Sequence, residues 1–351
     1  MPDVLYVGLQ EDDKIARFGI DAGAGKLEPR GETPAAGAPS VFAVSPNRHI
    51  LYVGYRGTPG IESWRIDSAG GALTSLGRVA TEHWPTYLAT DRTGKYLLSA
   101  HYQGGYAAVY PLGGDGAVSG PALDRQNTAP GAHAILTDPS NRFAFVPHIA
   151  RQNDNVLEPP KNIPGPNFIA QFRFDAATGR LSPNAPFKLD PPGPIGPRHY
   201  CFHPTLDLAY FSDEQGCSVT AYRVDRASGT LAVVGTTPSL PQGVTVRNTC
   251  SQIYLTPSGR FLYVGNRGHN SIAGFAVDPA GRLTPAGHAP TEAVPTAFGL
   301  DSRGTFLFAA GTATGRLASY RVDEATGKLA PLGIYSLGRR PAAVLAIPLG
   351  R

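Results

Sequence analysis

The chain has 351 residues and a formal net charge of +4, and 42% of it is hydrophobic, with 42 glycines and 33 prolines. This apolar content argues against a disordered chain, and the many turn-forming residues favour a large number of short strands. Lys and Arg are scattered along the chain, so no basic patch predicts a nucleic-acid partner. The small positive excess is compatible with an anionic small molecule.

The N-terminal segment MPDVLYVGLQEDDK has neither the basic region nor the long apolar core of a signal peptide. No apolar stretch approaches the roughly 18 residues that span a bilayer. The three cysteines, Cys201, Cys217 and Cys250, are odd in number and lack metal-ligand spacing. We therefore expect a cytoplasmic protein with reduced thiols, no membrane partner, and no metal or other cofactor.

Strand patterns begin at once and then repeat along the chain. Residues 4–32 hold three strand-like segments, the first of them VLYVG, with no strand before them. A longer unit then recurs about every 40–55 residues: an apolar strand, a P-x-G-R type turn, a strand like LYVG, a third alternating strand, and a D-x-x-x-G-x-L turn into a fourth. Its six complete copies begin near Pro39, Pro85, Ala132, Pro197, Thr249 and Pro295. The period-2 alternation predicts strands throughout, and no segment predicts a helix.

One copy is interrupted. In the unit that begins near Ala132, residues 151–167 (RQNDNVLEPPKNIPGPN) replace a tight turn. A long Pro-rich insertion between two strands is either a tolerated surface loop or part of a binding site. Both readings stay open from the sequence.

The last segment of the chain supplies what the first one lacks. Residues 341–349 (PAAVLAIPL) form a first strand with no successors. Joined to residues 4–32, they complete a seventh blade, and a closed ring removes free sheet edges. The sequence therefore predicts an all-β fold, a single domain over residues 1–351. We expect a seven-bladed β-propeller of four-stranded blades, closed by the C-terminal strand joining the N-terminal blade.

Connections in such blades alternate between two faces of the ring. On one face the turns are uniform (SPNRH, DRTGK, DPSNR, TPSGR and D-x-x-x-G-x-L), so their residues serve turn geometry. The other face receives varied ionisable and aromatic residues, and function concentrates where loops of a rigid scaffold converge. These residues include Arg56, Trp84, His101, Tyr102, His133, His148, Arg198, His199, Glu214, Arg247, Asn266 and Arg267.

Three segments carry a family resemblance: GAHAILTDPSNRFAFVP, GPRHYCFHP and YVGNRGHNSIAGFAVD. Over nearly its whole length the chain resembles the seven-bladed propeller lactonases, the family of the bacterial 6-phosphogluconolactonase and the 3-carboxy-cis,cis-muconate lactonizing enzyme. The resemblance implies that four residues lie where the family's proposed active-site residues lie: His133, Arg198, Glu214 and Arg267. The chain departs from the family pattern at His101, His148, Asp213 and Thr296.

Opening a lactone requires an activated water, a site for negative charge on the carbonyl oxygen, and groups that hold the substrate's anion. We expect Glu214 to act as general base, with His133 or His199 as acid for the leaving alkoxide. Arg198 and Arg267 offer planar forks for a carboxylate, a phosphate or an oxyanion. The expected substrate-binding residues are Arg56, His101, Tyr102, His148 and Asn266. No serine stands in a G-x-S-x-G elbow, which disfavours an acyl-enzyme.

Three functions remain open from the sequence. The first is a hydrolase that opens a small anionic lactone, such as 6-phosphogluconolactone, in carbohydrate metabolism. The second is a lactone-forming or lactone-opening step in aromatic catabolism, with a carboxylate substrate. The third is a binding platform without catalysis. The grouping of charged residues at one channel mouth favours an enzyme over a platform.

Overall fold

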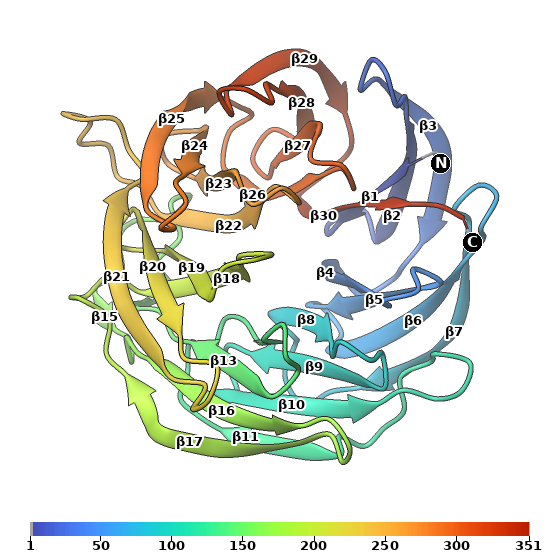
Figure 1. Ribbon diagram of the computed structural model, residues 1–351. Coiled ribbons are helices and arrows are strands. Elements are labelled where there is room, and N and C mark those ends of the chain that lie inside the picture. Colours follow the sequence, from blue (N-terminus) through green and yellow to red (C-terminus); the bar gives the residue numbers. More distant parts are fainter. Residues whose placement is uncertain (1–2, 351) are drawn as a thin grey trace.

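Seven four-stranded antiparallel sheets stand around a central channel in the computed structural model, which describes residues 3–350 (Figure 1). Every regular element in that range is a strand. No helix there could cross a membrane. The predicted seven-bladed ring is confirmed.

The strands follow the chain with little interruption. The N-terminal blade holds β1 (Asp3–Leu9), β2 (Lys14–Ile20) and β3 (Leu27–Pro34), with β30 (Pro341–Pro348) as its inner strand. The second blade holds β4 (Pro39–Val44), β5 (Ile50–Tyr55), β6 (Gly60–Ile66) and β7 (Leu73–Ala80). The third holds β8 (Tyr87–Thr90), β9 (Tyr96–His101), β10 (Tyr106–Pro111) and β11 (Asp124–Asn127). The fourth holds β12 (Leu136–Thr137), β13 (Phe143–Pro147), β16 (Ile169–Asp175) and β17 (Arg180–Leu189).

The remaining three blades repeat this order. The fifth holds β18 (Pro197–Phe202), β19 (Leu208–Asp213), β20 (Ser218–Val224) and β21 (Leu231–Pro238). The sixth holds β22 (Cys250–Leu255), β23 (Phe261–Asn266), β24 (Ser271–Val277) and β25 (Leu283–Pro290). The seventh holds β26 (Pro295–Leu300), β27 (Phe306–Gly311), β28 (Arg316–Val322) and β29 (Leu329–Ser336).

The two ends of the chain close the ring. β30 pairs antiparallel with β1, in a register that sets Asp3 opposite Pro348 and Val7 opposite Val344. In Figure 1 the red C-terminal strand lies beside the blue N-terminal one. The predicted completion of a seventh blade by the C-terminal strand is confirmed, so that each of the seven blades has four strands.

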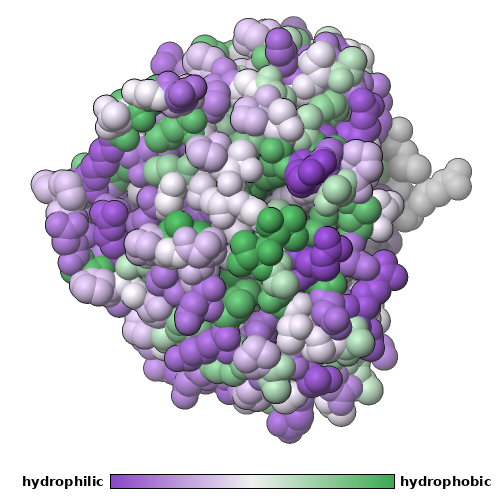
Figure 2. Space-filling view, turned by 60° about the vertical axis from the view of Figure 1, so that its left-hand side comes forward, coloured by the Kyte–Doolittle hydropathy of each residue, from purple (hydrophilic) through white to green (hydrophobic). Residues whose placement is uncertain are grey.

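The core is divided into layers between neighbouring blades. Leu5 and Val7 of β1, for example, pack with Phe306 and Phe308 of β27 across one blade boundary. The second strand of a blade is therefore buried along its whole length, as in β5 and β23, while the outermost strands β7 and β21 expose most of their residues. Figure 2 shows the result from outside: polar side chains cover most of the surface and hydrophobic ones gather near the middle of the view.

The D-x-x-x-G turns bind each blade to the one before it. At Gly229, φ is +71°, and a Cβ added there would overlap the ring of Phe143 in the preceding blade. The turn carbonyl also accepts a hydrogen bond, as Gly71 does from the Tyr6 hydroxyl at 2.6 Å. Glycine is thus required by both backbone conformation and close packing, which explains why the motif recurs.

Candidate active site

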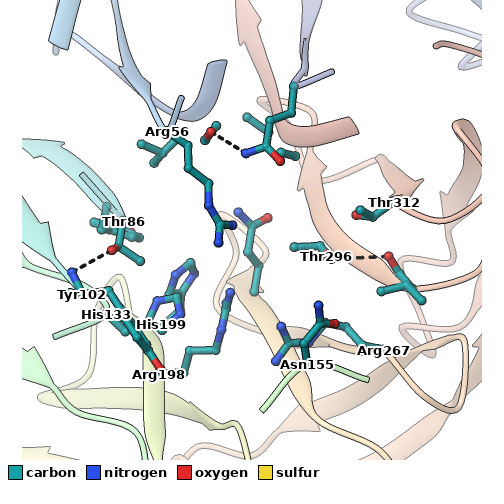
Figure 3. Close-up of a pocket in the computed structure, with 18 of the residues that line it drawn as sticks. Arg56, Thr86, Tyr102, His133, Asn155, Arg198, His199, Arg267, Thr296 and Thr312 are labelled. Atoms are coloured by element: carbon teal, nitrogen blue, oxygen red, sulfur yellow. Dashed lines mark hydrogen bonds between the residues drawn. The ribbon is translucent and has the colours of Figure 1, made fainter. Parts of the chain in front are cut away.

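The loop face is the face of the ring that carries the turns between the second and third strands and the connections between blades. A cavity of about 320 Å³ opens there, and residues from all seven blades line it (Figure 3). Its volume falls within the range usual for small-molecule sites. Among the predicted site residues, the structure brings these seven together in its lining: Arg56, Tyr102, His133, Arg198, His199, Glu214 and Arg267.

A buried carboxylate lies at the centre of one wall. Glu214 follows the end of β19, and its backbone N–H donates to the Gly196 carbonyl at 2.7 Å, while its carbonyl accepts from the Cys250 N–H at 2.9 Å. The residue is only 5% exposed. Arg267 Nη2 donates to Glu214 Oε1 at 2.6 Å, and Arg198 Nε lies 3.1 Å from Oε2. Glu214 therefore holds two arginines together at the junction of the fifth and sixth blades.

Arg198 owes its direction to an irregular strand. The register of β18 against β19 shifts between Pro197 and Tyr200, and such a bulge re-aims the side chains that it contains. The guanidinium is buried, and its Nη1 has no hydrogen-bond partner within the described chain. Burial and the nearby Arg267 charge lower the pKa of Arg198 to about 10, although Glu214 opposes the shift. The group is still charged at neutral pH and can receive an anion.

Two buried histidines stand beside this pair. The His133 and His199 rings meet edge to face, with centroids 5.1 Å apart, and His133 Nε2 lies 3.9 Å from Glu214 Oε2. That distance is too long for a hydrogen bond. Burial, followed by the Arg198 charge, lowers the pKa of each histidine well below the usual value of 6.5. Both imidazoles are therefore neutral at pH 7, and each keeps a nitrogen free to accept a proton.

Two of the predicted substrate-binding residues also face the cavity. The Arg56 guanidinium lies over the Trp84 ring, 4.5 Å from its centroid, and reaches into the space shown in Figure 3. The Tyr102 N–H donates to Thr86 Oγ1 at 3.0 Å, and its hydroxyl accepts from the Asn153 N–H at 2.9 Å. These two hydrogen bonds hold Tyr102 at its backbone and at its hydroxyl.

The other two predicted histidines do not reach the cavity. His101 stacks on Tyr106 at 4.2 Å and contacts Ser99 Oγ and the His83 carbonyl, each at 2.8 Å. His148 stacks on Phe168 at 4.1 Å, and its Nε2 lies 2.9 Å from Thr128 Oγ1. Burial lowers the pKa of His101 to about 4 and that of His148 to about 3. These rings fill space inside the third and fourth blades.

Asn266 is likewise turned into the protein. Its side-chain oxygen accepts from Ser239 Oγ at 2.8 Å and from Asn248 Nδ2 at 3.0 Å, and its nitrogen donates to the Ser239 carbonyl. Asn248 in turn accepts from the Gly268 N–H at 2.9 Å. The network supports the loop that carries Arg267, so Asn266 acts behind the cavity and not in it.

The insertion at residues 151–167 forms a wall of the cavity. Its strands β14 (Arg151–Gln152) and β15 (Ile163–Pro164) pair, and Asp154, Asn155 and Glu158 line the pocket. Arg247, in the connection before β22, donates to Asp154 Oδ1 at 2.7 Å and to the Asn155 carbonyl at 3.1 Å. Of the two readings that the sequence left open, the structure favours part of a binding site.

Several lining residues are not among those predicted from the sequence, including Gln10, Thr312 and Arg340. They follow β1, follow β27 and precede β30 respectively. The rule of alternating connections accounts for all three, because Gln10 and Arg340 adjoin the inner strands of the divided blade and Thr312 follows the second strand of a complete blade.

Metal ligands and disulfides are not found in residues 3–350. No three His, Cys, Asp or Glu side chains gather there in a geometry suited to a metal ion. Cys201, Cys217 and Cys250 are all free. Around Glu214, the described residues offer two arginines, one carboxylate and two neutral imidazoles that face the cavity, a set suited to binding an organic anion and moving a proton.

The fold and this cavity define a propeller with a small-molecule site at one mouth of its channel. The chain matches the family described as "Lactonase, 7-bladed beta-propeller" over residues 4–346, and it belongs to that family.

Named relatives extend along the whole chain. A 6-phosphogluconolactonase of Pectobacterium carotovorum is 33% identical over 350 residues, covering 99% of this chain and 100% of the relative. One of Yersinia pestis is 31% identical over 343 residues, covering 97% of each chain. A Lactobacillus plantarum protein of solved structure has a TM-score of 0.86 at 26% identity, with 99% of each chain covered. The Pseudomonas aeruginosa periplasmic gluconolactonase PpgL has a TM-score of 0.86 at 23% identity over the full length of both chains, a likeness of fold.

Proposed function

We propose that this protein is a lactone hydrolase that opens an anionic sugar-acid lactone of the 6-phosphogluconolactone type. Family membership and the names of the full-length relatives support hydrolysis of a lactone. The observation that carries the proposal for this chain is the buried group of Arg198, Glu214 and His133 at the channel mouth. It combines an anion-binding group with a proton acceptor in a site shielded from water.

His133 is the proposed proton carrier. From the sequence we expected Glu214 to be the base and a histidine the acid. A histidine that is neutral at the start of the reaction is not an effective acid, because only the imidazolium readily gives up a proton. We propose instead that His133 takes a proton from water as the water oxygen bonds to the lactone carbonyl carbon. The imidazolium then returns that proton to the ring oxygen as the carbon–oxygen bond breaks, giving the hydroxy acid.

Arg198 and Glu214 have complementary parts in this scheme. The carbonyl oxygen becomes an oxyanion when water adds, and the unpartnered Nη1 of Arg198 is the proposed donor to it. Glu214 holds Arg198 and Arg267 in place, and its negative charge, 3.9 Å from His133 Nε2, favours the transient imidazolium. His199, packed edge to face on His133, is proposed to fix the orientation of that ring.

A panel of lactones tests the proposal. Purified protein would be mixed with glucono-lactone, its 6-phosphate and a muconolactone, and acid release followed by pH-stat. We expect the 6-phosphate to be the best substrate, and Glu214→Gln to lower kcat/KM about 10²-fold because it removes the charge that supports His133 and the arginines. Asp207→Asn is the control, since Asp207 pairs with Arg226 in an exposed turn on the opposite face. Preferred turnover of the muconolactone, or full activity in Glu214→Gln, would contradict the proposal.

A further inference from the structure

The charges of the cavity are unevenly distributed. On one wall, from the fourth to the sixth blades, Arg198 and Arg267 share Glu214 as their partner, and the carboxylates of the insertion at residues 151–167 also line that wall. The opposite wall comes from the seventh, first and second blades and holds Gln10, Ser40, Arg56, Thr312 and Arg340. This second wall has two arginines and contributes no carboxylate to the lining. A ligand that spans the cavity therefore meets a second positive region.

Arg56 is the clearest part of that region. Among the residues that the structure describes, no carboxylate lies within ion-pair distance of its guanidinium, and its planar group rests on the Trp84 ring. Burial and then the Arg340 charge lower the pKa of Arg56, so the two cations lie near each other. Glu11 and Glu158 lie near Arg340. Arg56 is therefore the cation of the pair that lacks a carboxylate partner, and a bound anion would offset its charge.

The backbone that carries both arginines is firmly held. The N–H of Arg56 donates to the Ala38 carbonyl at 3.0 Å, and the next residue, Gly57, donates to the Gly37 carbonyl at 2.9 Å. The Arg340 carbonyl accepts from the Gln10 N–H at 3.1 Å, and its Nη1 lies 3.4 Å from Glu11 Oε1. Arg340 keeps most of its donors, because that contact is long and uses one nitrogen. The pair is thus positioned before any ligand arrives.

Arg56 and Arg198 face the same cavity from different sides. Figure 3 shows Arg56 extending into the cavity from the side opposite Arg198. Its charge is near enough to His133 to contribute to that residue's lowered pKa. A ligand whose carbonyl lies at Arg198 and His133 would place a group several bonds away beside Arg56 and Arg340. A phosphate monoester, with up to two negative charges and several acceptor oxygens, is the group that such arginine forks bind best.

We propose that Arg56 and Arg340 form a phosphate subsite, which selects lactones that carry a phosphate monoester on the carbon chain away from the carbonyl. The inference rests on the proposed lactonase function only for its substrate class, since binding of the phosphate group requires no turnover. Arg56 is the principal ligand, because it has no acid partner, and Arg340 assists it from the rim. Arg198 and Arg267 then act at the reacting end alone.

Calorimetry with the two reaction products tests the subsite directly. The wild-type protein is expected to bind 6-phosphogluconate at least about 10-fold more tightly than gluconate. Arg56→Ala should weaken 6-phosphogluconate binding by about 10- to 100-fold and shrink the difference between the two ligands, because charge-assisted hydrogen bonds are lost. Arg340→Ala should have a smaller effect in the same direction. Arg56→Lys should give an intermediate affinity, since it keeps the charge and loses the fork.

Arg339→Ala is the matched control. Arg339 adjoins Arg340, but it lies at the exposed rim and pairs with Asp12 at 2.8 Å. The Arg339→Ala variant should bind both ligands with the affinities of the wild type. The melting temperature of each variant shows whether it is folded. Equal affinity of the wild type for the two ligands would overturn the subsite, as would an Arg56→Ala variant that weakens both ligands by the same factor. A protein that discriminates the ligands but hydrolyses no lactone would retain the subsite and refute the proposed function.

Discussion

The two faces of the ring use the same kinds of residue for opposite purposes. The turn face is the face that carries the uniform turns between the first and second strands and between the third and fourth. There, Arg92 donates to the Thr137 carbonyl at 2.7 Å and to the Asp138 carbonyl at 3.2 Å, and so ties the third blade to the fourth. On the loop face, Arg198 is buried beside Glu214 with Nη1 unpartnered. Where an arginine satisfies backbone carbonyls it holds blades together. Where its donors are left free inside a cavity, it is available to a ligand.

The largest expected effect tests this contrast directly. Arg198→Ala should lower kcat/KM about 10²- to 10³-fold, because it removes the proposed oxyanion donor and leaves Glu214 with one partner. Arg92→Ala should instead lower the free energy of unfolding by about 1 kcal/mol and leave kcat/KM near that of the wild type. Lactone turnover and chemical denaturation of both variants measure the two outcomes. Equal effects on activity would remove the distinction between the faces.

Glycines of the turn face should show a purely structural effect. Gly229→Ala forces a Cβ at φ +71° into the Phe143 ring, so we expect it to cost about 2–3 kcal/mol of stability. Gly235→Ala is the control, because nothing lies within 4 Å of a Cβ at that position on β21. The midpoint of urea unfolding would separate the two variants, while kcat of the folded fraction should be the same in both. A Gly229→Ala protein as stable as Gly235→Ala would argue against the role of the turn in joining blades.

The loop face should show its chemistry in the pH dependence. Since burial and Arg198 hold the pKa of His133 well below 6.5, the imidazole stays neutral as the pH falls from 8 to 6. The rate should therefore hold through that range and decline only when the pH drops well below 6.5, where the base becomes protonated. In an Arg198→Lys variant the positive charge remains, so the pH at which the rate declines on the acid side should change little. A wild-type decline centred at pH 6.5 or higher would exclude His133 in this environment as the base.

The smallest effect concerns the insertion. Arg247→Ala removes the contact with Asp154, and the wall of the cavity should loosen, which raises KM about 2- to 5-fold with little change in kcat. Lys161→Ala is the control within the same segment, because its pair with Glu158 is about half exposed at both ends. Steady-state kinetics on the preferred lactone would distinguish them. An unchanged KM in Arg247→Ala would indicate that the insertion is a tolerated surface loop and not part of the binding site.

Much of this protein could be predicted residue by residue because its repeat is local. The D-x-x-x-G turn that ends at Gly229 requires a positive φ whatever surrounds it, so its place in the fold follows from the sequence. The same alternation of connections predicted that Arg56, Tyr102 and Glu214 would converge. It did not predict the direction of a side chain, and His101 and His148 share the loops of the site yet turn back to stack on Tyr106 and Phe168.

The sequence by itself determined the seven blades, the closure by the last strand and the face on which the ionisable residues gather, because each follows from short-range periodicity. The tertiary structure decided which of those residues share one cavity, that Glu214 joins two arginines, and that Arg56 and Arg340 stand together. These relations join blades that are far apart in the chain. The packed ring buries Arg198 and Arg267 beside Glu214 and leaves Arg56 without a carboxylate partner. That arrangement sets the charge of the cavity walls and the protonation of the histidines.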